Sequence, residues 1–176
     1  MFEYDFTSTN GRGAHLVAKT ALMKVSREVL MANSTYFDRL LGGNFKEGHS
    51  TFVEIHEDTV QSVELWFRIL HGNIGDGSYS IERKEIWEAI ALTRKYFFHI
   101  EKMSSWFATY WSRLDKNKLE LDGLKELLYP AQAFDNPIAF AYVTKTIAHI
   151  GEDHIEERNP TRHRELHVEG QVIRKY

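Results

Sequence analysis

The chain has 176 residues, 43% of them apolar and 27% charged, a composition that is ordinary for a globular protein and excludes disorder over the whole length. It contains no cysteine, which excludes disulfide frameworks, cysteine-based zinc sites and cysteine nucleophiles and fits a reducing compartment. The formal net charge is −3 and neither half has the basic excess that neutralises phosphates, so we expect no binding to nucleic acid by this chain alone.

Three segments predict strands. Residues 14–18 and 21–25 are two apolar stretches, which we expect to be two short strands joined near Lys19 or one bent strand. Residues 51–56 alternate β-forming and polar side chains, which is typical of a half-buried strand. Together these segments predict a small sheet near the start of the chain.

The first helices lie between these strands. Residues 29–32 predict a helical turn or two. Ser34 is a suitable N-cap for a helix over 35–41, because its hydroxyl can accept a hydrogen bond from an N–H of the first turn. Gly42 and Gly43 follow and would end that helix, since glycine adopts the conformation of a helix end without steric cost.

Three aromatic-rich helices come next. The first should begin at Asp58, an acidic N-cap with Gln61 three positions later, and end at Gly72, and Ser80 should cap the second. Aromatic side chains recur in these helices at helical spacing, which predicts core positions because each ring buries about 150–250 Å². We expect one member of each adjacent pair in the third helix to face the C-terminal helices or a partner. The aromatic residues concerned are Trp66, Phe67, Trp87, Trp106, Phe107, Tyr110 and Trp111.

A polar break at 115–118 suggests a boundary between residues 1–114 and 115–176. Beyond it we expect a short helix near 124–129 and a longer one over about 137–150. The second should begin at a proline, whose missing N–H costs nothing at the first position of a helix. With the strands near the start and helices afterwards, the order of elements predicts an α+β fold.

The longest unbroken apolar run, residues 138–143, is far shorter than the roughly 20 residues that span a bilayer. The first residues lack the basic region and apolar stretch of a secretory signal, so we expect none. The sequence therefore predicts a soluble protein of the cytoplasm or the nucleus that does not bind membranes.

The stretch 23–37 resembles the central signature of BTB/POZ domains, in which a strand leads into an apolar helix and a serine caps the next helix. The similarity covers about residues 14–114 and continues through Phe45-Lys46-Glu47, the segment 52–56, Asp58 and Ile69-Leu70-His71-Gly72. Three later segments resemble the C-terminal extension of fungal BTB proteins: Leu127–Ala131, Phe134–Asn136 and Asn159–Thr161. The chain departs from the family at Ser26, where a histidine is usual, and near Asn33, where an arginine or similar residue is usual.

The resemblance implies a BTB/POZ domain over 1–114, with a mainly three-stranded sheet covered by helices, and a helical extension over 115–176. It also implies a protein-interaction module without catalysis that homodimerises, recruits partners to a cullin-RING ubiquitin ligase, or does both. Phe45 and Glu47 stand where cullin-binding members carry a hydrophobic-x-Glu motif, with Tyr36 and Asp38 nearby. An alternative is that Phe45 folds back onto the core. For self-association the resemblance points to the start of the chain and the first helix: Leu16, Val17, Val29, Leu30 and Met31.

Other functions find less support in the sequence. His163 and His167 are four residues apart, a spacing that places both on one helix face and can hold zinc. The order H-x-E-x-H differs from the HExxH of metalloproteases and no third ligand is obvious, so two surface histidines are the simpler interpretation. We find no catalytic motif and expect no enzyme activity, cofactor or bound metal. A purely structural dimerisation module, or a transcription-associated one without cullin binding, remains the main alternative.

Overall fold

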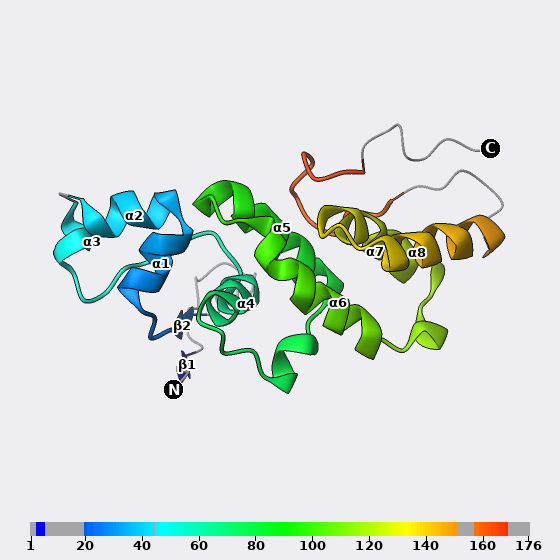
Figure 1. Ribbon diagram of the computed structural model, residues 1–176, viewed down its shortest axis with the longest axis horizontal. Helices are drawn as coiled ribbons and strands as arrows, with labels where there is room; N and C mark the ends of the chain where they lie inside the picture. Colours follow the sequence, from blue (N-terminus) through cyan, green and yellow to red (C-terminus); the bar gives the residue numbers. More distant parts are fainter. Residues whose placement is uncertain (1–2, 6–19, 44, 151–156, 169–176) are drawn as a thin grey trace, which may run out of the picture.

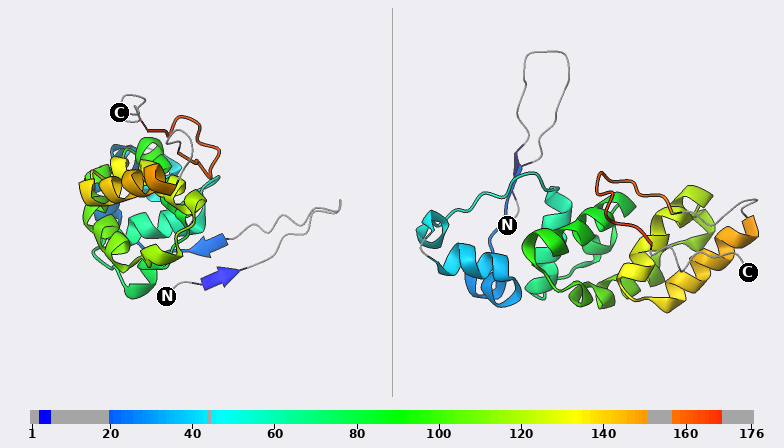
Figure 2. Two further views of the ribbon diagram at one scale, coloured as in Figure 1. Left: turned by 90° about the vertical axis from the view of Figure 1, so that its right-hand side faces the viewer. Right: turned by 90° about the horizontal axis from the view of Figure 1, so that it is seen from above.

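The structure is a computed structural model that describes residues 3–5, 20–43, 45–150 and 157–168. Its helices follow one another along the long axis of an elongated molecule (Figure 1). Figure 2 shows the same order from above: α1 to α3 at one end, α4 to α6 in the middle, α7 and α8 at the other end. The α-helices are α1 (Arg27–Asn33), α2 (Thr35–Gly42), α3 (Lys46–His49), α4 (Val60–Leu70), α5 (Arg83–Tyr96), α6 (Ser104–Arg113), α7 (Leu121–Ala133) and α8 (Pro137–Ile150). Short 3-10 helices connect some of them: η1 (Asp76–Tyr79), η2 (Ile100–Met103) and η3 (Lys116–Lys118).

The prediction of an α+β fold with a mainly three-stranded sheet is wrong, because the described part of the chain is nearly all helical. Among the described residues only β1 (Glu3–Asp5) and β2 (Thr20–Leu22) are strands, and they pair antiparallel with Glu3 opposite Leu22. The fold is therefore nearly all helical. We expected two short strands at the start of the chain. The expected strand 21–25 overlaps β2, and the expected strand 14–18 lies outside the described residues.

The segment 51–56 is extended but is not a strand. Val53 and Ile55 of this segment pack partly buried against the core, whereas Phe52 is 68% exposed. A strand also needs a neighbouring strand for its backbone hydrogen bonds. No described strand lies beside this segment. The alternation of side chains is therefore present without the backbone hydrogen bonds of a sheet.

Two predicted helix starts are confirmed. Ser34 caps α2, where its Oγ accepts the N–H of Phe37 at 3.0 Å. Pro137 begins α8, and the Oδ1 atom of Asn136 accepts the N–H of Ala139 at 2.9 Å. Both starts depend only on residues within one helical turn, which is why the sequence predicts them.

Two other predicted caps are wrong. Thr59 rather than Asp58 caps α4, because the Asp58 carboxylate is engaged by the side chains of α5 described below. The helix α5 begins at Arg83 after Glu82, three residues beyond the expected cap Ser80.

The predicted aromatic core is confirmed, and its tryptophans tie separate elements together. Three of the buried indole N–H groups donate to a backbone carbonyl of another element: Trp66 to Ala89 at 2.7 Å, Trp87 to Glu126 at 2.8 Å, and Trp106 to Ser78 at 3.0 Å. A buried indole needs such a partner. These bonds connect α4 with α5, α5 with α7, and α6 with η1.

The C-terminal helices continue the same core across the predicted boundary at 115. Phe107 packs on Phe134 after α7, with ring centroids 4.8 Å apart, and Trp111 packs on Tyr142 of α8 at 5.5 Å. The expectation that part of α6 faces the C-terminal helices is therefore confirmed. The short helix expected near 124–129 is longer, since α7 spans Leu121–Ala133.

Residues 157–168 form an irregular segment that lies along α5 and α7 (Figure 1). Leu166 and Val168 anchor it in the core, and Asn159 Nδ2 donates to the carbonyls of His163 and Leu166 at 2.8 and 3.1 Å. None of the helices in the described part of the chain is both long and apolar enough to cross a membrane.

Candidate partner-binding surface

The turn that joins α2 to α3 and continues to residue 52 is held by one side chain of α1. Arg27 donates to three backbone carbonyls, those of Leu41 at 3.0 Å, Gly48 at 2.5 Å and Ser50 at 2.9 Å. A guanidinium carries five N–H donors in a rigid fork, which suits it to several acceptors at once. Arg27 therefore fixes the path of a segment that contains only one turn of helix.

Close backbone contact also shapes this turn. A Cβ atom at Gly48 would lie 2.7 Å from the carbonyl oxygen of Gly43 and 3.2 Å from that of Leu41. Both neighbours are backbone atoms, which cannot move aside as a flexible side chain can. Gly48 is thus packed tightly against the end of α2.

Phe45 and Glu47, the predicted cullin-contact residues, lie on this turn. Phe45 is the N-cap residue of α3 and its ring is 58% exposed, so the alternative in which it folds back onto the core is wrong. Glu47 is half-buried in the first turn of α3, and its carboxylate has no hydrogen bond or ion pair with another described residue.

Tyr36 and Asp38 belong to the opposite end of α2. Tyr36 is 37% exposed, and its ring meets that of Tyr96 edge-on with the centroids 5.0 Å apart. Asp38 is exposed in the first turn of α2. Six residues at a rise of about 1.5 Å each place Tyr36 roughly 9 Å along the helix axis from Gly42, the last residue of α2, and Phe45 lies beyond that end. The four residues therefore share one end of the molecule but do not form one contact cluster.

The start of α2 is fastened to the end of α5 by a polar network. The Oγ atom of Ser34 donates to the carbonyl of Tyr96 at 2.5 Å. Lys95 Nζ donates to Asp58 at 2.8 Å and to the carbonyl of His56 at 2.9 Å, and the Tyr96 hydroxyl donates to Asp58. Burial raises the pKa of the Tyr96 phenol, and the hydrogen bond to Asp58 raises it further. The network holds His56 and Asp58 against the end of α5.

The predicted dimer-contact residues divide into three groups. Leu30 is buried inside the protein at 3% exposure, so its side chain is not on the surface. Val29 and Met31 are half-buried on α1. Leu16 and Val17 lie outside the described residues.

Sequence reasoning missed two residues of this end. Phe52 is the more exposed of the two phenylalanines beside α3, and Arg27 holds the turn between them. The alternation over 51–56 could have indicated that Phe52 faces outward once Val53 and Ile55 face inward. No sequence signal could have indicated the three carbonyls that Arg27 binds.

The two candidate zinc ligands do not share a helix face, because residues 163–167 form a turn. His163 Nε2 lies 2.9 Å from Glu88 of α5 and His163 Nδ1 lies 3.4 Å from Glu165, whereas His167 Nδ1 approaches the carbonyl of Val168. The described part of the chain contains no group of three or more side chains that could hold a metal ion.

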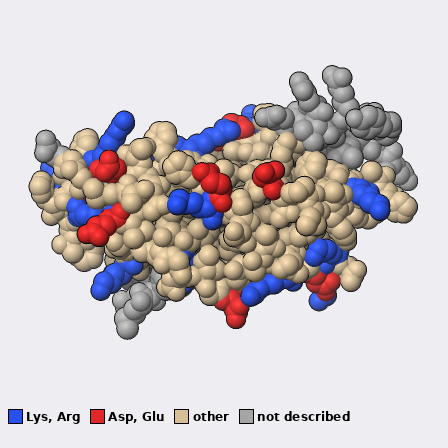
Figure 3. Space-filling view, viewed as in Figure 1, with Lys and Arg blue, Asp and Glu red and all other residues tan. Residues whose placement is uncertain are grey.

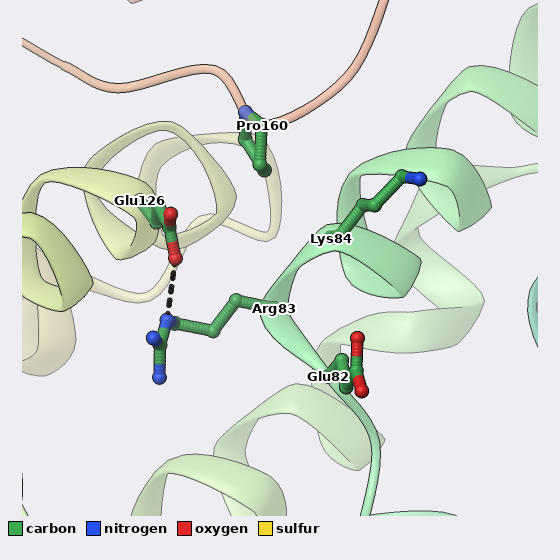
Figure 4. Close-up of a pocket in the computed structure, with 5 residues that line it drawn as sticks. All are labelled: Glu82, Arg83, Lys84, Glu126 and Pro160. Carbon is green, nitrogen blue, oxygen red and sulfur yellow. Dashed lines mark hydrogen bonds and ion pairs between the residues drawn. The ribbon is translucent and has the colours of Figure 1, made fainter.

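A charged pocket of about 270 Å³ lies where α5, α7 and the C-terminal segment meet. Figure 4 shows Arg83 reaching across to Glu126, with Pro160 above them; the Nε–Oε2 distance is 2.7 Å. Arg158 also pairs with Asp122 and lies 3.7 Å from Glu126. The two arginines pair with carboxylates of α7, and these ion pairs join α5, α7 and the C-terminal segment.

The visible surface carries no field of one sign. Figure 3 shows lysines and arginines interspersed with aspartates and glutamates over the whole described face. This distribution offers no extended basic track for a phosphate backbone.

Comparison of the chain with protein-family models, with curated proteins and with solved structures gives no match.

Proposed function

We propose that the chain is a protein-interaction module of the BTB/POZ type that contacts a cullin scaffold of a ubiquitin ligase through the turn around α3. The observation that carries this proposal is the exposed ring of Phe45 on a turn held by Arg27. An exposed aromatic side chain on a fixed backbone is a typical anchor, since little conformational entropy is lost when it enters a pocket. The proposal rests on the resemblance of the helical segments and not on a sheet.

Glu47 supports the same assignment. Its carboxylate is half-buried beside the anchor and has no partner among the described residues. A donor on the partner would therefore satisfy a group that the folded chain leaves unpaired. The proposal does not include catalysis.

We further propose that the module forms a homodimer through the start of the chain and the outer side of α1, where Val29 and Met31 are half-buried. Leu30 is not part of this contact, since it belongs to the core. The cytoplasm or the nucleus is the proposed location, because a chain without cysteine suits a reducing compartment.

Size-exclusion chromatography with light scattering, run with and without the N-terminal domain of a cullin, tests both proposals. The expected result is a dimer alone and a larger complex with the cullin, which Phe45→Ala and Glu47→Lys abolish or weaken by about tenfold or more. Ile138→Ala is a matched control, because Ile138 is 75% exposed on α8 at the other end of the molecule. A complex that survives both substitutions overturns the cullin contact. A dimer that binds no cullin supports a purely structural module instead.

A further inference from the structure

The C-terminal segment, residues 157–168, is a closed loop that lies along α5 and α7 (Figure 1). It contains neither helix nor strand, and its ends are joined where the Glu157 carboxylate accepts the N–H of Val168 at 2.6 Å. Within it, Asn159 donates to two carbonyls further along the segment, at 2.8 and 3.1 Å. A short irregular segment whose ends meet and whose polar groups bind one another resembles an Ω-loop, a class that is frequently functional. The segment can therefore leave the helices as one unit.

The ion pairs between this segment and the helices all have the same polarity. Among the residues that the structure describes, the segment supplies the nitrogen donors and the helices supply the carboxylates. Arg158 pairs with Asp122 of α7 and lies 3.7 Å from Glu126. His163 Nε2 lies 2.9 Å from Glu88 of α5. The surface beneath the segment is thus acidic, and it is complementary to a basic chain.

Two apolar side chains of the segment are buried in the helical core. Leu166 is 1% exposed and Val168 is 6% exposed, and the exposed His167 separates them. Pockets for alternate side chains are a common way of recognising a peptide. In the described part of the chain, the one backbone hydrogen bond from the segment to a helix joins the N–H of Arg158 to the carbonyl of Lys125 at 3.2 Å. Segments held by so few buried side chains and backbone bonds open at a lower free energy than the helices beneath them.

The helices beneath the segment are joined without it. The indole of Trp87 donates to the carbonyl of Glu126 at 2.8 Å, and Arg83 of α5 binds the carboxylate of the same residue at 2.7 Å. The surface would therefore keep its shape if the segment left. Glu88, whose side chain is 18% exposed, has no partner among the described residues other than His163. Its carboxylate would then be available to a cation of another chain.

The charged pocket of about 270 Å³ opens at the edge of the segment, beside Pro160 (Figure 4). Its other lining residues belong to the start of α5 and to α7. The segment therefore leaves part of this junction unfilled, and a competing chain can approach there.

We propose that the surface of α5 and α7 beneath residues 157–168 is a binding site for a basic segment of a partner protein, and that the C-terminal segment occupies it as an internal competitor. The partner segment carries a cation for Asp122 or Glu88 and two apolar side chains, one residue apart, for the positions of Leu166 and Val168. This site lies on other elements than the turn around α3, so the inference is independent of the proposed cullin contact.

The test uses the full chain and a fluorescent peptide with the sequence of residues 157–168. Leu166→Ala loosens the internal segment, so fluorescence anisotropy should show the peptide binding this variant at least about tenfold more tightly than the wild-type chain. Arg158→Ala, a change at an exposed side chain, should act in the same direction without touching the core. Equal affinity for the wild-type chain and both variants, or no binding to any of them, overturns the proposal.

An exchange of charges tests where the peptide lies. The Asp122 side chain is 62% exposed, so Asp122→Arg disturbs little packing. A chain with Asp122→Arg should prefer a peptide that carries Arg158→Asp over the original peptide, whereas the Leu166→Ala chain should prefer the original. If both chains prefer the same peptide, the site on α7 is wrong. A peptide that carries Leu166→Asp is the control for the apolar pocket and should bind neither chain.

Hydrogen exchange separates a displaceable segment from an integral part of the core. In Leu166→Ala, exchange of the Arg158 amide, which donates to α7, should become faster while exchange in α5 and α7 stays at the wild-type rate. Faster exchange throughout α5 and α7 would show that the helices need the segment in order to stay folded, and the role of an internal competitor would then be wrong.

Discussion

Trp87 donates its indole N–H to the backbone carbonyl of Glu126, which is the carbonyl that Pro130 leaves without a helical partner. Proline has no N–H, so the bond from residue 130 to residue 126 of α7 cannot form. The distance from Trp87 Nε1 to the carbonyl oxygen is 2.8 Å. A side chain of α5 thus completes the hydrogen bonding of α7 and allows a proline inside that helix.

The first prediction follows from this bond. Trp87→Phe leaves the carbonyl of Glu126 unsatisfied and should lower the free energy of unfolding by about 1–3 kcal/mol in addition to the loss of packing. In a Pro130→Ala background the new N–H of residue 130 can bind that carbonyl, so Trp87→Phe should cost about 1 kcal/mol less. Urea denaturation of the four proteins of this double-mutant cycle measures the difference. If the losses of unfolding free energy caused by the two substitutions simply added, the indole of Trp87 would not replace the hydrogen bond that Pro130 cannot form.

The second prediction concerns alkaline pH. Burial is the main cause that raises the pKa of Tyr96, Tyr110 and Tyr129, and Asp58 contributes further at Tyr96. A phenol whose pKa is raised in the folded state stabilises the protein fully below the unfolded pKa of about 10, and that stability is lost as the pH rises above it. Ultraviolet absorbance should therefore show these three phenols ionising only together with unfolding.

Tyr96→Phe isolates one of these three groups. The absorbance change that accompanies alkaline unfolding should fall by the contribution of one phenol. The absorbance change at lower pH, in which the other tyrosines ionise before the protein unfolds (the early phase), should keep its amplitude. Tyr142→Phe, a change at a half-exposed residue of α8, is the comparison. If Tyr96→Phe reduces only the early phase, the Tyr96 hydroxyl is accessible in the folded protein and the network with Asp58 is wrong.

The third prediction concerns Glu157, whose carboxylate accepts the N–H of Val168 at 2.6 Å. Burial raises its pKa above the usual 4.5, against the lowering effects of the Val168 N–H and of His167. The raised pKa means that its contribution to stability is present below the unfolded value and is lost as the pH rises through the folded value.

Glu157→Gln keeps an oxygen that can accept the N–H of Val168 but removes the charge. We expect the variant to have a higher melting temperature than the wild-type protein at neutral pH. The difference should shrink as the pH falls toward 4.5, the usual value of the carboxyl group. Melting curves by circular dichroism across this pH range are the measurement, and a difference that grows on acidification would show the opposite linkage.

The fourth prediction tests the tight turn after α2. In Gly48→Ala the new Cβ would lie 2.7 Å from the Gly43 carbonyl oxygen. Because backbone must move, we expect a loss of about 1–3 kcal/mol in the free energy of unfolding and weaker cullin binding. Gly75→Ala is the matched control, since a Cβ there meets nothing within 4 Å. Equal stability of the two variants would show that the turn has room for a side chain.

Several features of this protein could be predicted from nearby residues alone. The cap at Ser34 and the start of α8 at Pro137 depend on hydrogen bonds within a few positions. The burial of Trp66, Trp87 and Trp106 follows from their size and helical spacing. Phe45 was also a candidate contact residue on the resemblance, and its exposure is consistent with that role.

Other features depended on residues far away in the chain. Asp58 is a residue type that favours the N-cap position. Lys95 and Tyr96 bind its carboxylate, however, and Thr59 caps α4 instead. The alternation over 51–56 sets the direction of the side chains but cannot supply a neighbouring strand, so the predicted sheet was wrong. Likewise, spacing alone suggested a helix for His163 and His167, whereas the packing of Leu166 and the bonds of Asn159 impose a turn.

The sequence by itself determined where α2 and α8 begin, that the large aromatic side chains form the core, and that the chain contains no cysteine. Only the tertiary structure decided that Arg27 would hold the turn between Phe45 and Phe52, and that Trp87 would satisfy the carbonyl left by Pro130. The physical reason is the separation in the sequence over which each interaction acts. Caps and periodicity act within one or two turns, whereas hydrogen-bond partners that are distant in the sequence exist only after the helices have packed.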